Sequence, residues 1–164
     1  MADVTSLANS LAHGTPEERL ASAEALARLG GEASPAAIAL VQALEIEDDG
    51  LRDWLVAALE DLGAPAAADA PALAALVTKP SLDAPYWAAT LLGRLESQAA
   101  SAVPQLTKAL DEHAESAVRE RAAWALGKIG PAAAGARSSL EAAAKSGNAR
   151  LARLAGEALS QIGG

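Results

Sequence analysis

A repeat of 33 or 34 residues constrains this chain more than any other feature of its sequence. The end of each unit is marked by four glycines and one glutamate: Gly30, Gly63, Glu96, Gly130 and Gly163. A leucine lies four residues before each of these positions: Leu26, Leu59, Leu92, Leu126 and Leu159. A fixed period of about 20 to 50 residues is typical of solenoids, in which each unit packs only against its neighbours.

Residues 118–130 show best what each unit contains. Their apolar side chains recur at i, i+4, i+7, i+8 and i+11, which places them in one stripe along an α-helix: Val118, Ala122, Ala125, Leu126 and Ile129. Gly130 and Pro131 end that helix. A shorter apolar helix precedes each such segment, so the repeat unit is a pair of helices. We expect one domain over residues 1–164, built from units at about 3–30, 34–63, 70–96, 102–130 and 132–163.

Local signals place several helix ends. Thr15, followed by Pro16 and by Glu18 three residues after the cap, predicts a capped helix start. Ser34-Pro35 is expected to open the next outer helix directly. Residues 79–85 contain two prolines and are expected to form a long turn within the third pair, with the inner helix beginning at Tyr86.

Composition agrees with an all-α protein and excludes several classes. Apolar residues make up 51% of the chain but aromatic residues only 2%, which favours closely packed helices rich in alanine and leucine. The formal charge of −8 disfavours a nucleic-acid partner, which needs clustered cations. Cysteine is absent, and the sequence shows neither a signal peptide nor a membrane span, so we expect a cytoplasmic protein.

The pattern Val-Arg-x-x-Ala-Ala-x-Ala-Leu-Gly-x-Ile-Gly at residues 118–130 resembles the second helix of a HEAT repeat, in the short form of phycobilisome lyase-like repeats. Residues 51–63 and 19–30 resemble it too, whereas residues 84–96 depart from it at Pro85 and Glu96. The resemblance implies an α-solenoid, a right-handed superhelix of about five helix pairs. It also implies that Arg19, Arg52 and Arg119 form a ladder of hydrogen bonds to acidic residues between neighbouring units, interrupted at Pro85.

No residue pattern predicts catalysis, a metal or a cofactor. The two histidines, His13 and His113, occupy equivalent repeat positions three units apart, too far from one another to share a metal ion. We expect them to cap the carbonyl end of the outer helices. Some HEAT-like proteins are di-iron hydroxylases with His-Glu pairs, but here Gly14 and Ala114 follow the histidines, so that activity does not carry over.

The aromatic residues all fall on inner helices: Trp54, Tyr86, Trp87 and Trp124. At 100° per residue, Tyr86 and Trp124 point about 160° away from the apolar stripe, so we expect both to be exposed. Loss of Trp124 should then cost little stability. Trp54 and Trp87 lie at the edge of the stripe, where either packing between helices or partner binding fits their position.

These aromatic residues and nearby cations predict a protein-binding surface, with Arg94, Arg121 and Lys128 at its rim. The leading hypothesis is a non-catalytic scaffold or adaptor that holds a protein or peptide on the concave face. The alternative, implied by the lyase-like resemblance, is a protein that holds a bilin chromophore or its acceptor. A HEAT-like nucleic-acid glycosylase would need a basic groove, which the acidic composition disfavours.

Overall fold

The computed structural model describes residues 3–163, which contain ten α-helices in five successive pairs and no strand. The all-helical prediction is thereby confirmed for this part of the chain. The chain divides into two compact units that meet in sequence at Asp69 and Ala70. The expectation of a single domain stays a prediction.

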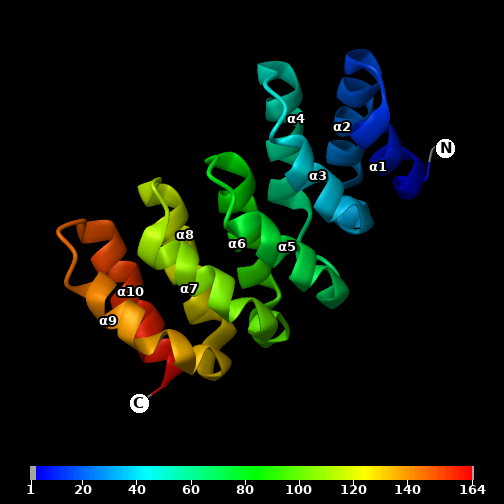
Figure 1. The fold of residues 1–164 in the computed structure, drawn as a ribbon. Helices are drawn as coiled ribbons and strands as arrows, with labels where there is room; N and C mark the ends of the chain where they lie inside the picture. The colour runs from blue at the N-terminus through cyan, green and yellow to red at the C-terminus, as the bar shows by residue number, and fades with distance from the viewer. Residues whose placement is uncertain (1–2, 164) are drawn as a thin grey trace. The chain divides into compact units, whose positions relative to one another are not determined.

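The N-terminal unit contains two helix pairs (Figure 1). Its elements are α1 (Val4–His13), α2 (Pro16–Leu29), the 3₁₀ helix η1 (Gly30–Ala36), α3 (Ala37–Ala43), α4 (Asp49–Asp61) and η2 (Ala67–Asp69). The outer helices α1 and α3 pack against each other, as do the inner helices α2 and α4. The predicted cap of α2 is present, since the Glu18 backbone N–H donates to Thr15 Oγ1 at 3.3 Å and the Thr15 N–H donates to Glu18 Oε2 at 2.8 Å.

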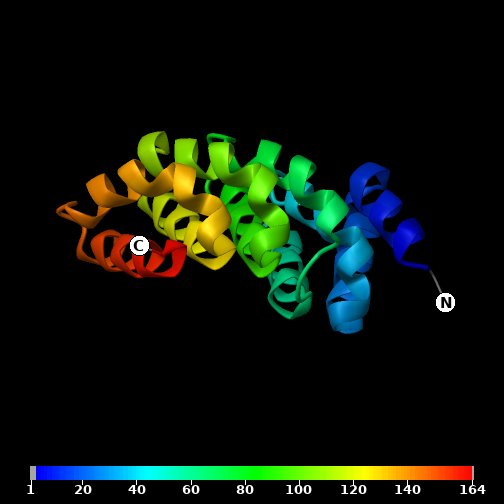
Figure 2. The same ribbon diagram turned by 90° about the horizontal axis from the view of Figure 1, so that it is seen from below.

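The C-terminal unit contains three pairs in two layers. Its elements are α5 (Ala70–Val77), α6 (Asp83–Arg94), η3 (Glu96–Ala102), α7 (Val103–Glu112), α8 (Ser116–Ile129), η4 (Gly130–Ala136), α9 (Arg137–Ala144) and α10 (Ala149–Ile162). The outer layer is α5, α7 and α9, and the inner layer is α6, α8 and α10, with contacts between successive helices of each layer. Figure 2 shows α9 in one layer and α10 in the other.

The residues that end each unit share a positive φ angle. All four repeat glycines have positive φ, and Glu96, at the fifth position, has a φ of 52°. This left-handed conformation disfavours side chains other than glycine, so the fifth position keeps the geometry of the repeat at the expense of strain. At Gly30, Glu96 and Gly130 the chain continues into a 3₁₀ helix.

Two helices begin at residues other than those predicted from the sequence. Ser34 and Pro35 lie inside η1 and the outer helix begins at Ala37, because the 3₁₀ turns consume the residues after the glycine. Likewise, Pro85 is the third residue of α6, which begins at Asp83 instead of Tyr86. Proline fits there because the first turn of a helix has no partner for its backbone N–H groups.

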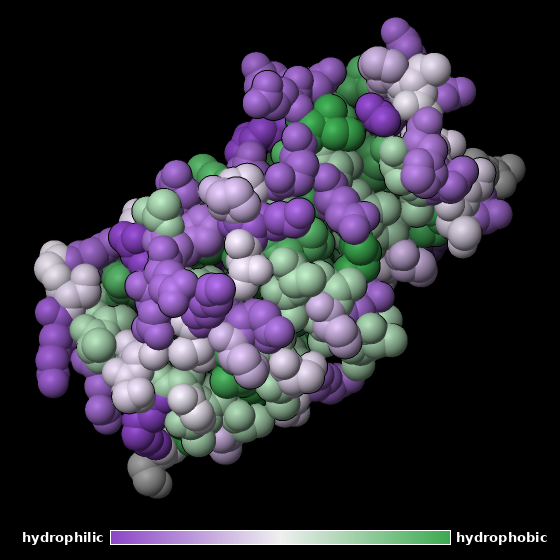
Figure 3. All heavy atoms as spheres, in the orientation of Figure 1, coloured by the Kyte–Doolittle hydropathy of each residue, from purple (hydrophilic) through white to green (hydrophobic). Residues whose placement is uncertain are grey.

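The core lies between the layers and is built mainly from leucine and alanine. Leu26, Leu59, Leu92 and Leu126 are fully buried, as their period predicts, whereas Leu159 is only half-buried. On the face shown in Figure 3, hydrophilic and hydrophobic residues are interspersed. Among residues 3–163, no helix combines the length and the apolar character that a membrane crossing requires.

Candidate functional site

The inner layer of the C-terminal unit carries a pocket of about 290 Å³. Three of the predicted site residues line it together with four others: Tyr86, Ala117, Glu120, Arg121, Trp124, Arg150 and Leu154. They come from α6, α8 and α10, and consecutive helices of this layer are in contact. We call this cavity the inner-layer pocket.

Arg121 lies between two aromatic rings of this pocket. Its guanidinium carbon is 4.6 Å from the centre of the Tyr86 ring and 4.9 Å from that of Trp124. Arg121 Nη2 also donates a hydrogen bond to the Tyr86 hydroxyl. Both distances are within the range of cation–π attraction, so the two rings hold the guanidinium in place. We call Tyr86, Arg121 and Trp124 the arginine clamp.

Trp124 is half-buried, so the prediction that it is exposed is wrong. Its six-membered ring covers Gly93 of α6: a Cβ atom at residue 93 would lie 2.9 Å from both Cε3 and Cη2 of the ring. Real Cβ atoms essentially never approach another atom this closely, so the absence of a side chain at Gly93 provides the space for the indole. Because Trp124 thus packs on the neighbouring helix, its removal should cost stability, contrary to the expectation from the sequence.

The other aromatic residues divide between packing and lining the pocket. Trp87 is buried, with 8% exposure, which favours the packing interpretation of its position. Tyr86 is half-buried, not exposed as predicted, and its ring meets Trp87 edge-on at 5.8 Å. Trp54 is half-buried on α4 of the N-terminal unit and is not among the residues of the inner-layer pocket.

The two remaining rim cations contact the indole rings. The Arg94 guanidinium carbon lies 5.9 Å from the centre of the Trp87 ring, and Lys128 Nζ lies 5.9 Å from that of Trp124. Lys128 is exposed and Arg94 half-buried. These predicted residues therefore surround the tryptophans of the inner layer, and neither lines the inner-layer pocket.

Three polar residues at the edge of the pocket are not among the predicted site residues. Arg150 Nε lies 3.2 Å from Glu120 Oε2, and Asn148 Nδ2 donates to Glu120 Oε1 at 3.0 Å. The Glu120 carboxylate is therefore engaged by α10 and its cap. The repeat could have indicated that Glu120 belongs to the site, because Glu120 occupies the same repeat position as Tyr86.

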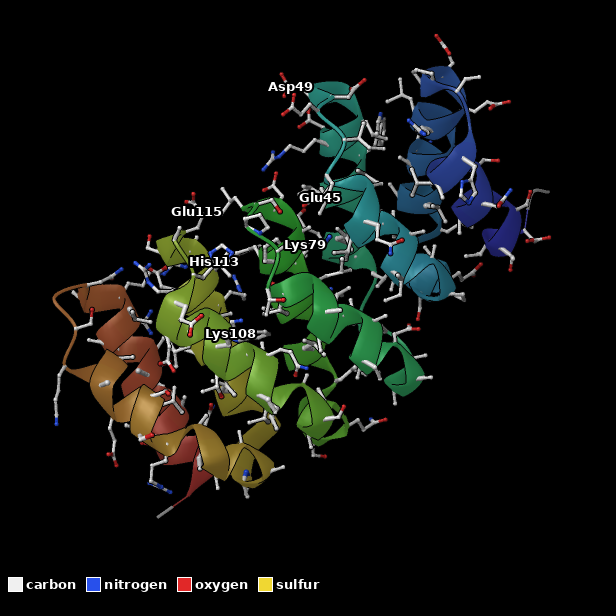
Figure 4. The ribbon with its side chains drawn as sticks, viewed as in Figure 1. Glu45, Asp49, Lys79, Lys108, His113 and Glu115 are labelled. Carbon is white, nitrogen blue, oxygen red and sulfur yellow. The ribbon has the colours of Figure 1, made fainter. Side chains whose placement is uncertain are left out.

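His113 joins two turns of the C-terminal unit (Figure 4). Its ring is buried, with Nδ1 accepting from the Glu115 backbone N–H at 3.1 Å and Nε2 lying 2.8 Å from the Lys79 carbonyl oxygen. Because Nδ1 accepts, it carries no proton, so Nε2 is the protonated nitrogen and donates a hydrogen bond to the Lys79 carbonyl oxygen. The expected carbonyl contact is present, but it joins His113 to the preceding pair instead of capping its own helix. His13, at the equivalent position, is exposed.

Two arginines of the predicted ladder, Arg19 and Arg119, form hydrogen bonds within their own helix pairs. Arg119 Nη1 donates to the carbonyls of His113 and Ala114, at 2.5 and 3.1 Å, and Arg19 Nη2 reaches the Ala12 carbonyl at 3.4 Å. For Arg19 and Arg119 the expected ladder to acidic residues of neighbouring units is therefore wrong. These side chains bind the carbonyl groups that the end of the outer helix leaves unpaired, which are closer than the acids.

The described part of the chain brings together no three histidine, aspartate or glutamate side chains that could bind one metal ion. The distinctive feature of the pocket is the Arg121 guanidinium, which two aromatic rings hold beside the paired carboxylate of Glu120. Such an arrangement can bind a polar or charged group of another molecule.

Comparison with known proteins identifies the repeat. The sequence profile of HEAT repeats matches residues 70–160, which is more than half of the chain. No curated protein matches the sequence of this chain.

Similar solved structures include an engineered protein with 23% identity and a TM-score of 0.66, covering 99% of this chain and 80% of the other. A designed armadillo repeat protein in complex with the peptide (KR)4 has 18% identity and a TM-score of 0.68, with 97% and 81% coverage. Another designed armadillo repeat protein has 19% identity and a TM-score of 0.62, with 97% and 82% coverage. At these identities the structures share the fold of a helical-repeat solenoid. Since the profile match spans most of the chain, the protein belongs to the HEAT-repeat family.

Proposed function

We propose that this protein is a non-catalytic interaction module that holds a peptide segment of a partner protein on the inner layer of its C-terminal unit. The observation that carries the proposal is the arginine clamp within a pocket of about 290 Å³. Tyrosine, tryptophan and arginine are the residue types that dominate the binding energy of protein interfaces.

The fold supports this role. Helical repeats form extended surfaces in which the core positions fix the fold and the remaining positions are available to a partner. One solved structure similar to this chain, the designed armadillo repeat protein, holds the peptide (KR)4. The size of the pocket fits one or two side chains of a peptide, since pockets for drug-sized ligands measure about 300–1,000 Å³. The lyase-like alternative stays a prediction from the resemblance alone.

The test begins with selection of peptides from a random displayed library against the full chain. Selected peptides are then titrated against Ala117→Gln, which places a longer side chain at a half-buried position lining the pocket. The control is Ala142→Gln, at an exposed position of α9 in the outer layer.

We expect Ala117→Gln to weaken binding by about tenfold, because disruption of an interface at its centre typically costs more than about 1 kcal/mol. Ala142→Gln should bind like the parent. Equal binding by all three proteins, or a library that yields no binder, would contradict the proposal.

A further inference from the structure

The charge of this chain is distributed unevenly. Residues 1–69 contain three basic residues and thirteen acidic ones, which gives a formal charge of −10. Residues 70–164 contain ten basic residues and eight acidic ones, which gives a formal charge of +2. In the C-terminal unit the excess lies on the inner layer. Its three helices carry six cationic residues: Arg94, Arg119, Arg121, Lys128, Arg150 and Arg153. They carry three acidic residues: Asp83, Glu120 and Glu157.

Two cations line the inner-layer pocket, and of these Arg150 is paired with Glu120 whereas Arg121 makes no ion pair with a described residue. Among the described residues its polar contact is the Tyr86 hydroxyl, and the remaining contacts are with the faces of two rings. The neighbouring carboxylate of Glu120 is bound by Arg150 and Asn148. A guanidinium has five N–H donors, so most of those of Arg121 are available to a ligand.

Resting on the function proposed above, we propose that the arginine clamp recognises a side-chain carboxylate of an acidic peptide segment. The planar guanidinium accommodates the two oxygens of a carboxylate through paired N–H···O bonds. The two rings already hold it in one orientation, so binding orders the arginine side chain less than it would order a free one.

The rest of the pocket suits an aspartate or glutamate. Ala117 and Leu154 supply apolar atoms for the methylene groups of the incoming side chain, and because Arg150 is paired with Glu120, Arg121 leaves the pocket with one net positive charge. A basic segment fits the site poorly. An arginine from a partner would compete with Arg121 for the space between the rings, and it would find the Glu120 carboxylate already bound by Arg150 and Asn148.

The experiment uses the full chain and two fluorescein-labelled octapeptides, one alternating glutamate with alanine and one alternating lysine with alanine. Binding is followed by fluorescence anisotropy at low ionic strength. The variants are Arg121→Gln, Arg121→Lys and Lys145→Gln. Lys145→Gln is the control for Arg121→Gln. It removes the same charge, but Lys145 is exposed and does not line the inner-layer pocket.

We expect the acidic peptide to bind more tightly than the basic one. Arg121→Gln should weaken its binding by about tenfold, equivalent to about 1.4 kcal/mol, and Lys145→Gln by less than about twofold. Arg121→Lys should also weaken it, because an ammonium keeps the charge but not the fork of donors. Tighter binding of the basic peptide, or equal losses from Arg121→Gln and Lys145→Gln, would overturn the proposal.

A second pair of variants removes any dependence on the folding of Arg121→Gln. Ala117→Glu introduces a carboxylate at the pocket, where it should occupy the clamp and repel the acidic peptide, while Ala142→Glu adds the same charge to the outer layer. Loss of binding in the first variant only is expected, and equal binding by both would overturn the proposal. If library peptides bind this layer but are not acidic, the proposed function stands and the inference about acidic segments fails.

Discussion

The contact between Gly93 and Trp124 can be tested by a double-mutant cycle. Gly93 lies inside α6, where replacement by alanine normally stabilises a helix by about 0.5–1 kcal/mol. Here the added methyl group would overlap the indole ring, 2.9 Å from two of its carbon atoms. Overpacking of this kind typically costs about 1–3 kcal/mol. We therefore expect Gly93→Ala to lower the free energy of unfolding by about 1–2 kcal/mol.

In a Trp124→Ala background the same change should raise the free energy of unfolding. Trp124→Ala alone should cost about 1–2 kcal/mol, because burial of a whole large apolar side chain contributes about 1.5–3 kcal/mol and this one is half-buried. With the ring absent, Gly93→Ala keeps its helix-forming advantage of about 0.5–1 kcal/mol. The coupling energy between the two positions should thus be about 1–3 kcal/mol.

The assay is urea unfolding of the four proteins, followed by far-ultraviolet circular dichroism so that loss of tryptophan does not alter the signal. Gly156→Ala is the control, since a Cβ atom at this position inside α10 meets nothing within 4 Å. It should stabilise the protein by about 0.5–1 kcal/mol. Additivity of Gly93→Ala and Trp124→Ala within about 0.5 kcal/mol would refute the placement of the ring over the glycine.

Three further predictions concern the repeat. Glu96→Gly should stabilise the protein by about 1 kcal/mol by relieving the positive φ of 52°, while Glu96→Ala, which keeps the strain, should not; thermal melting of both variants checks this. Leu126→Ala should cost about 2–5 kcal/mol in urea unfolding, because the side chain is fully buried, and a variant that unfolds like the parent would contradict the register of the repeat. His113→Ala should cost about 1–3 kcal/mol in the same assay by removing two part-buried hydrogen bonds to backbone groups, whereas His13→Ala, at the exposed equivalent position, should cost almost nothing.

The fold was predictable from the sequence because it depends on period. Leucines 33 or 34 residues apart occupy the same place in every pair, and four of the five are fully buried. The same period placed Glu96 in the position of a glycine, and the backbone there has a positive φ like the glycines. A repeat thus fixes backbone conformation even where the residue type does not match it.

The details of the site were less predictable because they depend on pairs of helices. The direction of Trp124 was derived from the rotation of α8 alone, which ignores the neighbouring helix. Because Gly93 of α6 has no side chain, the indole can pack against α6 instead of pointing into solvent. The carbonyl contacts of Arg119 and His113 also depend on how the turns lie beside one another, information that helical periodicity does not contain.

The residues of the pocket differ in how far their substitution would affect folding as well as binding. Trp124 contributes to both, since its ring packs on Gly93 and lines the pocket, so loss of binding in Trp124→Ala has two possible sources. Arg121 occupies a repeat position, nine residues before the unit end, at which the chain places very different side chains: Trp54, Trp87, Arg121 and Leu154. The repeat thus accepts tryptophan, arginine and leucine at this position, so the fold requires no single residue type there. Because Arg121 also contacts Tyr86 and Trp124, the variant that best separates recognition from folding is Ala117→Glu, which leaves all three residues of the arginine clamp in place.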